Sequence, residues 1–149
     1  RRQRQMCIRD RGEAGERGGS YGDLYVFINI NNHKLFQRER DNIICDVAIP
    51  FTTATLGGNI EVPTIEKKMV NVSIPKGMQS GHKLRIKGKG MSILRTNTRG
   101  DMIVKVHAET PVNLSSDQEK LLNQFNETLT KKNSKMTEGF FDKVKKMFN

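Results

Sequence analysis

The sequence predicts a mostly β protein, an antiparallel β-sandwich with one short helical turn, followed by a C-terminal helical segment. Three observations predict this fold class. Between positions 24 and 108, short runs of alternating apolar and polar residues are bounded by Gly, Pro and Asn. After Pro111 the apolar residues follow a helical period instead. Only 35% of the 149 residues are hydrophobic, so the core residues must be concentrated in these runs.

Six runs show the alternation of a β-strand, in which successive side chains point to opposite faces. In Ile43–Ile49 the odd-numbered apolar side chains share one face, and Pro50 ends the run. The segment Phe51–Leu56 is rich in Thr and predicts one helical turn that stops at Gly57-Gly58. Glu66-Lys67-Lys68 is short enough for a tight hairpin. The predicted strands are Leu24–Ile30, Ile43–Ile49, Ile60–Ile65, Met69–Ile74, Leu84–Lys87 and Asp101–Ala108.

Two helical stripes follow the last predicted strand. Ser115 or Ser116 is the expected N-cap of the first helix, and Gln118 or Glu119 completes a capping box. Helices this short are marginal alone in water, so their apolar faces need a partner, either the β domain or another copy of the chain. The stripes are Leu121, Leu122, Phe125 and Leu129, and, after a polar linker over 131–138, Phe140, Phe141, Val144, Met147 and Phe148.

The sequence repeats itself once. A Gly-rich polar loop, a Gly-Asp step and an alternating strand occur twice, at an offset of 78 residues, which is 100 minus 22. A period this long predicts two related domains in tandem and not a solenoid. The first copy comprises only a last loop and a last strand, so we expect the chain to begin near the end of a domain whose body is missing. The aligned pairs are Gly22-Asp23 with Gly100-Asp101, Gly12 with Gly90, and Ile8 with Ile86.

The sequence predicts no catalytic, metal or cofactor site, and hence no enzyme. Cys7 and Cys45 have no Cys or His partner at metal-ligand spacing, and we expect two reduced thiols in a cytoplasmic protein. The three histidines are far apart, and Gly88-Lys89-Gly90 lacks the spacing of a phosphate loop. No run is long enough to span a membrane, and no signal-peptide pattern opens the chain.

The net charge of +10 makes a basic β-rich nucleic-acid-binding module the main alternative. One predicted strand face is cationic because four basic residues alternate with apolar ones: Lys83, Arg85, Lys87 and Lys89. No aromatic residues interleave with them to stack bases. A solvated sheet face or a charged edge strand explains the same pattern.

Peptide binding through β structure is the function that remains. A half-buried sheet with apolar side chains near its edge can add an extended peptide as an extra strand. Simple packing in the core explains each of these side chains equally well. The candidates to line such a groove are Val47, Ile49, Phe51, Leu56, Ile60 and Val62.

Several short motifs between about residues 11 and 149 indicate a protein family through their order and number. They are Gly12-Glu13-Ala14-Gly15, Gly22-Asp23-Leu24-Tyr25-Val26, His33-x-x-Phe36-x-Arg38, Ala54-x-Leu56-Gly57-Gly58, Ile60-Glu61-Val62-Pro63-Thr64, Leu84-Arg85-Ile86-x-Gly88-x-Gly90, Thr110-Pro111-Val112 and Phe140-Phe141-Asp142-x-Val144-Lys145. Together they resemble the DnaJ family of co-chaperones.

The resemblance implies two tandem β-sandwich client-binding domains followed by a C-terminal dimerisation segment. On this chain it implies the end of the first domain over 11–32, the second domain over 33–112 and the dimerisation segment over 113–149. Residues 1–10 depart from the repeat, because Asp10 stands where Gly88 predicts a loop glycine. We therefore expect them to be a non-native scar or part of a broken gene fragment. The implied dimer contacts are Leu121, Leu122, Phe125, Phe140, Phe141 and Val144.

The resemblance also implies a function. It is that of a co-chaperone that binds unfolded or misfolded polypeptide, forms a homodimer and supports a DnaK-type chaperone in protein folding and heat stress. Contact with that chaperone is expected through a J domain, whose His-Pro-Asp motif this sequence lacks. Zinc is expected only in the Cys-rich region of a full-length parent, which is lacking too. For this stretch we expect no cofactor, membrane or nucleic acid, and a structural spacer is a weaker alternative.

Overall fold

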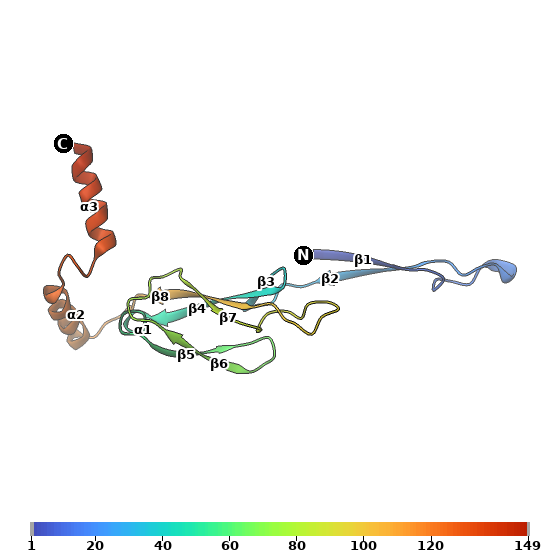
Figure 1. Cartoon of the computed structure of the whole chain (residues 1–149), viewed down its shortest axis with the longest axis horizontal. Helices are drawn as coiled ribbons and strands as arrows, with labels where there is room; N and C mark the ends of the chain where they lie inside the picture. Colours follow the sequence, from blue (N-terminus) through green and yellow to red (C-terminus); the bar gives the residue numbers. More distant parts are fainter. Residues whose placement is uncertain (1, 149) are drawn as a thin grey trace. The chain divides into compact units, whose positions relative to one another are not determined.

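The computed structural model describes residues 2–148, with side chains for all of them except residues 2–4 and 17. The chain divides into two compact units, Arg1–Glu109 and Thr110–Asn149. Among the described residues, the first unit contains eight strands and a short helix, and the second contains two helices; Figure 1 labels them. The strands are β1 (Arg2–Ile8), β2 (Leu24–Ile30), β3 (Phe36–Glu39), β4 (Asn42–Pro50), β5 (Gly58–Pro63), β6 (Met69–Ile74), β7 (Lys83–Ile86) and β8 (Met102–Glu109), and the helices are α1 (Phe51–Leu56), α2 (Ser116–Thr128) and α3 (Lys135–Phe148), with a 3-10 turn at Glu16–Gly18.

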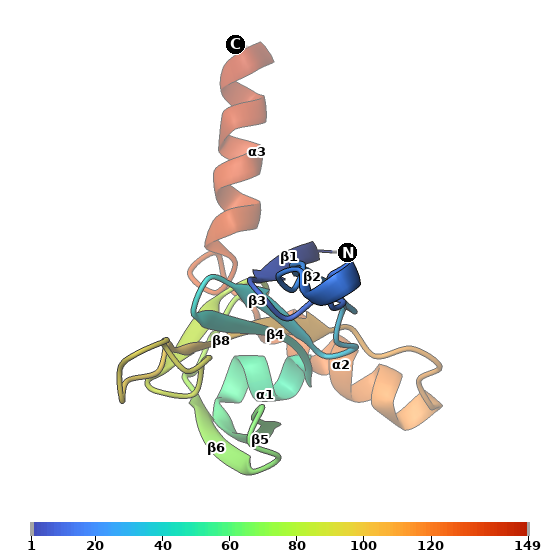
Figure 2. The same ribbon diagram turned by 90° about the vertical axis from the view of Figure 1, so that its right-hand side faces the viewer.

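The sandwich consists of a four-stranded sheet in the order β3-β4-β8-β7 and a two-stranded sheet of β5 and β6. Helix α1 and the β5–β6 hairpin lie on one side of the larger sheet (Figure 2). The predicted β-sandwich is confirmed, but the larger sheet is mixed and not wholly antiparallel. Its central strands β4 and β8 run parallel, with Ile43 opposite Met102 and Pro50 opposite Glu109. The chain can return in this direction because α1, β5, β6 and β7 form a long crossover between the two strands.

The core lies between the two sheets and follows the alternation read from the sequence. In β6, Val72 and Ile74 are buried while Asn71 and Ser73 between and beside them are exposed. Met102 and Val104 of the central strand β8 are fully buried. The buried hydrophobic residues are Ile43, Cys45, Ile49, Ala54, Val62, Val72, Ile74, Met78, Met102, Val104 and Val106.

The two hairpins β1–β2 and β7–β8 have the same register, as the 78-residue repeat predicts. Met6 lies opposite Val26 in the first hairpin, and Leu84 lies opposite Val104 in the second. Their loops are also closed alike. The Gly12 N–H donates to the Gly22 carbonyl at 2.6 Å, and the equivalent Gly90 N–H donates to the Gly100 carbonyl at 2.8 Å. The repeat is therefore also present in the three-dimensional structure and is not a chance similarity of sequence.

Residues 2–10 also share backbone geometry with the equivalent residues of the repeat. Asp10 has a φ of 55° where Gly88 has 68°, so both occupy the left-handed region that the loop requires. Their N–H groups bond to equivalent carboxylates, Asp10 to Asp23 at 3.4 Å and Gly88 to Asp101 at 3.0 Å. Asp tolerates this conformation better than most residues. Residues 2–10 thus fit the repeat, and residue 1 lies outside the described residues.

Two strands were not predicted. β3 is only four residues long and has one apolar residue, Phe36. A strand this short shows no detectable alternation. It is held by an antiparallel pairing with β4 in which Phe36 lies opposite Cys45. β1 has no detectable alternation because its first four residues, Arg2–Gln5, are all polar. Both strands depend on their partner and not on their own pattern.

The second unit has the two predicted helices, but α3 begins at Lys135, within the stretch 131–138 that was expected to be a polar linker. Ser115 is the N-cap of α2, its side chain accepting from the Gln118 N–H while the Gln118 side chain accepts from the Ser115 N–H, which confirms the capping box. Neither α2 nor α3 has a buried residue. Their apolar side chains are therefore available to a partner.

Candidate functional site

The larger sheet has an open edge along the second half of β4. Strand β3 begins at Phe36, opposite Cys45, so residues 46–50 of β4 have no described strand on that side. The Ile43 N–H donates to the Asp101 carbonyl beside β8, which fixes the direction of alternate backbone groups. By this alternation the backbone groups of Asp46 and Ala48 point away from β8, toward the open edge. An extended peptide could pair with them as an added strand.

Four of the predicted groove residues are exposed or half-buried. Val47 is on the core face of β4, packs against the core and is half-buried. Leu56, at the end of α1, has 68% of its surface exposed, and Phe51 at the start of α1 is half-buried. Ile60 of β5 is also half-buried and packs against the core. These four candidate residues keep the accessible surface that a peptide groove requires.

Two of the predicted groove residues lack the accessible surface that a peptide would need. Ile49 has 2% of its surface exposed and Val62 has none, and both belong to the core cluster. A peptide cannot contact them while the sandwich is closed, so their assignment to the groove is corrected to core packing. The alternation showed correctly that Val47 and Ile49 share a face, but it could not show which of them the neighbouring elements would cover.

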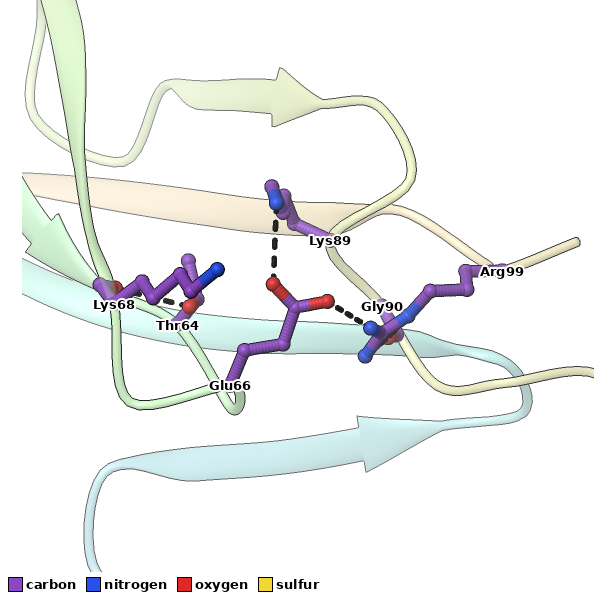
Figure 3. A network of polar contacts seen from close by, with 6 residues as sticks. All are labelled: Thr64, Glu66, Lys68, Lys89, Gly90 and Arg99. Carbon is purple, nitrogen blue, oxygen red and sulfur yellow. Dashed lines mark hydrogen bonds and ion pairs between the residues drawn. The ribbon is translucent and has the colours of Figure 1, made fainter.

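A polar network on the sandwich fixes the turn between β5 and β6. The Glu66 carboxylate accepts from the Lys89 ammonium at 3.2 Å and also pairs with the Arg99 guanidinium (Figure 3). Arg99 in turn donates to the Gly90 carbonyl at 2.9 and 3.1 Å. The hydrogen bond from Lys89 is the main reason that the pKa of Glu66 lies below its usual value, with the nearby positive charges adding to it. The network therefore joins the smaller sheet to the loop that precedes β8.

The cationic strand face is partly neutralised in the structure. Lys89 is half-buried and bonded to Glu66, and the Arg85 guanidinium lies 3.7 Å from the Asp101 carboxylate. Lys83 and Lys87 are exposed. Two of the four predicted phosphate contacts thus already have acidic partners, which favours the charged-edge interpretation.

The candidate dimer contacts are exposed or half-buried. Leu121 has 65% of its surface exposed, and Phe140 has 62%. Phe125 and Phe141 are exposed at 47% and 54%, while Leu122 and Val144 are half-buried. Unpartnered apolar faces of this kind on short helices require a covering partner. Among residues 2–148, no helix is long and apolar enough to cross a membrane.

The sequence has clear relatives. The family model described as "DnaJ C terminal domain" matches residues 1–111, including the residues assigned above to a scar. The chain belongs to the DnaJ C-terminal domain family. A second model, "Chaperone protein DnaJ C-terminal region", matches residues 117–149.

Named relatives agree with this DnaJ assignment. The chain is 52% identical over 140 residues to the Chaperone protein DnaJ of Paramagnetospirillum magneticum, covering 92% of this chain and 37% of that protein. It is 50% identical over 137 residues to the Chaperone protein DnaJ of Rhodospirillum centenum, covering 92% of this chain and 36% of the relative. The chain therefore spans little more than a third of the length of these relatives. None of them favours the nucleic-acid alternative.

Proposed function

We propose that the chain is a client-binding and dimerising part of a DnaJ-type co-chaperone, acting with a DnaK-type chaperone in protein folding and the heat-stress response. The family match and the names of the relatives support this proposal. Contact with the DnaK-type chaperone is assigned to a J domain of the parent, and zinc to a Cys-rich region of the parent. The parent is assigned to the cytoplasm and has no enzymatic role of its own.

The proposed mechanism is strand addition at the open edge of β4. A client segment in extended conformation pairs with the backbone groups of Asp46 and Ala48 and places alternate side chains over Val47 and Leu56. The observation that carries the proposal is the unpaired stretch of β4 over residues 46–50, where the backbone groups of Asp46 and Ala48 face the open edge. Backbone hydrogen bonds make such binding tolerant of sequence, and the apolar contacts select for exposed hydrophobic segments.

Dimerisation makes this weak site bivalent. Burying one exposed Leu or Phe contributes roughly 1.5–3 kcal/mol, and each tail presents several such side chains on α2 and α3. A dimer holding one unfolded chain at two sites gains avidity from the high effective concentration of the second site. The tail thereby supplies affinity that the open edge lacks by itself.

The edge is tested with a matched pair of leucines in the 149-residue chain. Leu56→Ser is expected to raise the Kd for a fluorescein-labelled, extended apolar nonapeptide about tenfold, since losing one apolar contact costs about 1.4 kcal/mol. Leu94→Ser is the control, because Leu94 is 85% exposed in the β7–β8 loop, which contacts Asp41 at the opposite end of β4 from residues 46–50. Fluorescence anisotropy measures both. Equal effects of the two substitutions, or no binding by the unaltered chain, would overturn the proposed site.

A further inference from the structure

The apolar and charged residues of α3 are completely segregated. At about 100° per residue, its apolar side chains fall within an arc of about 140°. Lys143 and Lys145 are the charged residues nearest to the two borders of this arc. Four lysines against Glu138 and Asp142 give the helix a net charge of +2. The apolar residues are Met136, Phe140, Phe141, Val144, Met147 and Phe148.

Helix α2 also separates its apolar residues from its charged ones, but the charged residues beside its apolar arc are acidic. Leu121, Leu122 and Phe125 fall within an arc of about 100°. The charged residues nearest to its two borders are Asp117 and Glu119, both in the first turn. Three acidic residues against one lysine give α2 a net charge of −2. The acidic borders of α2 are thus complementary to the lysine borders of α3.

We infer that α3 of one chain packs on α2 of a second copy, and that the reciprocal pair forms across the two-fold axis of the dimer. This inference rests on the proposed dimerisation and names its contacts. An isologous dimer contains this pair twice, so both apolar faces of each tail are covered. Pairing α3 with α3, or α2 with α2, would instead place like-charged borders side by side, which is destabilising.

Charge reversal distinguishes the possible pairings. The first variant, Lys143→Glu/Lys145→Glu, gives both helices acidic borders, and the second, Asp117→Lys/Glu119→Lys, gives both helices basic borders. Each variant alone should have a dimer Kd raised roughly 30-fold or more, since four attractive border pairs per dimer become repulsive. An equimolar mixture should recover the dimer, because each α2 then meets an α3 of opposite charge.

Sedimentation equilibrium of the whole 149-residue chain gives the masses, and far-UV circular dichroism shows whether the helices persist. The matched control is Lys135→Glu/Lys146→Glu, which makes the same charge change on the polar side of α3 and should leave the dimer intact. If α2 unfolds in the second variant, Asp117→Asn/Glu119→Gln replaces it, with a weakening of about fivefold expected.

Three results would overturn the inference, each for a different reason. If either variant alone dimerises like the unaltered chain, like helices pair with like. If the mixture stays monomeric while both variants keep their helices, the helices pair within one chain. If the unaltered chain is itself monomeric, the proposed dimerisation fails, and the pairing fails with it. Recovery of the dimer only on mixing is the expected result.

Discussion

Replacing Gly100 with alanine is expected to destabilise the sandwich strongly, while the same change at its repeat equivalent Gly22 is not. A Cβ on Gly100 would lie 2.5 Å from the carbonyl carbon of Asp41 and would overlap its oxygen. These are backbone atoms of the β3–β4 turn, which cannot rotate away as a side chain would. A Cβ on Gly22 would meet only the Glu13 carbonyl, at 3.8 Å, which is an ordinary contact.

The size of the effect follows from this difference. Forcing an extra carbon into a packed site costs typically about 1–3 kcal/mol, and we expect the upper end at Gly100 because the backbone itself must shift. For a unit of about 100 residues, 3 kcal/mol corresponds to a fall in Tm of roughly 15 °C. At Gly22, alanine reduces the freedom of the unfolded chain, so the change should be neutral or stabilising by up to about 1 kcal/mol.

Urea and thermal unfolding followed by far-UV circular dichroism measure both variants, since the chain has no Trp to serve as a fluorescent probe. The expected result is a large shift of the transition for Gly100→Ala and none, or a small rise, for Gly22→Ala. Equal midpoints for the two variants would refute the reasoning that the β3–β4 turn encloses the second hairpin but not the first.

Three further predictions concern single side chains. The pKa of Glu66 in the folded protein lies below its usual value of 4.5, chiefly because of the hydrogen bond from Lys89. The ionised Glu66 carboxylate therefore stabilises the fold above pH 4.5, and this stabilisation is lost as the pH falls through the lower pKa of the folded state. Glu66→Gln should remove that part of the acid dependence of the urea midpoint, and an unchanged dependence would count against it. Ser115→Ala should destabilise α2 by about 1 kcal/mol, seen as lost helical circular dichroism on heating. A thiol reagent should label exposed Cys7 at once and buried Cys45, whose pKa is raised by burial, only on unfolding.

Much of the sandwich could be predicted because alternation is a local property. The runs from Ile43 to Ile49 and from Met69 to Ile74 form strands with the expected faces inward. The cap at Ser115 and the turn at Gly57, with a φ of 79°, follow from similarly local chemistry. The repeat was detectable because Gly12 and Gly90 close equivalent loops, and Asp23 and Asp101 accept equivalent hydrogen bonds.

The features that the sequence did not reveal depend on distant partners. Nothing local to Ile43–Ile49 shows that its neighbour is the parallel strand β8. Which of the candidate groove residues stay accessible could not be predicted for the same reason, because Val47 and Ile49 are alike in sequence and differ in what covers them. Val47 is half-buried and Ile49 has 2% of its surface exposed, although neither has a described strand beside it on the β3 side. How far each side chain is covered is a property of the assembled sandwich.

The most direct test of the account compares two forms of one apolar peptide, unmodified and with N-methyl groups on alternate backbone nitrogens. Methylation removes the donors that an added strand needs at Asp46 and Ala48 while leaving every side chain in place. The account predicts that the 149-residue chain binds the unmodified peptide and that methylation on the pairing side weakens binding at least about tenfold, through loss of hydrogen bonds worth roughly 0.5–1.5 kcal/mol each. Equal affinity for the two peptides would contradict strand addition at β4.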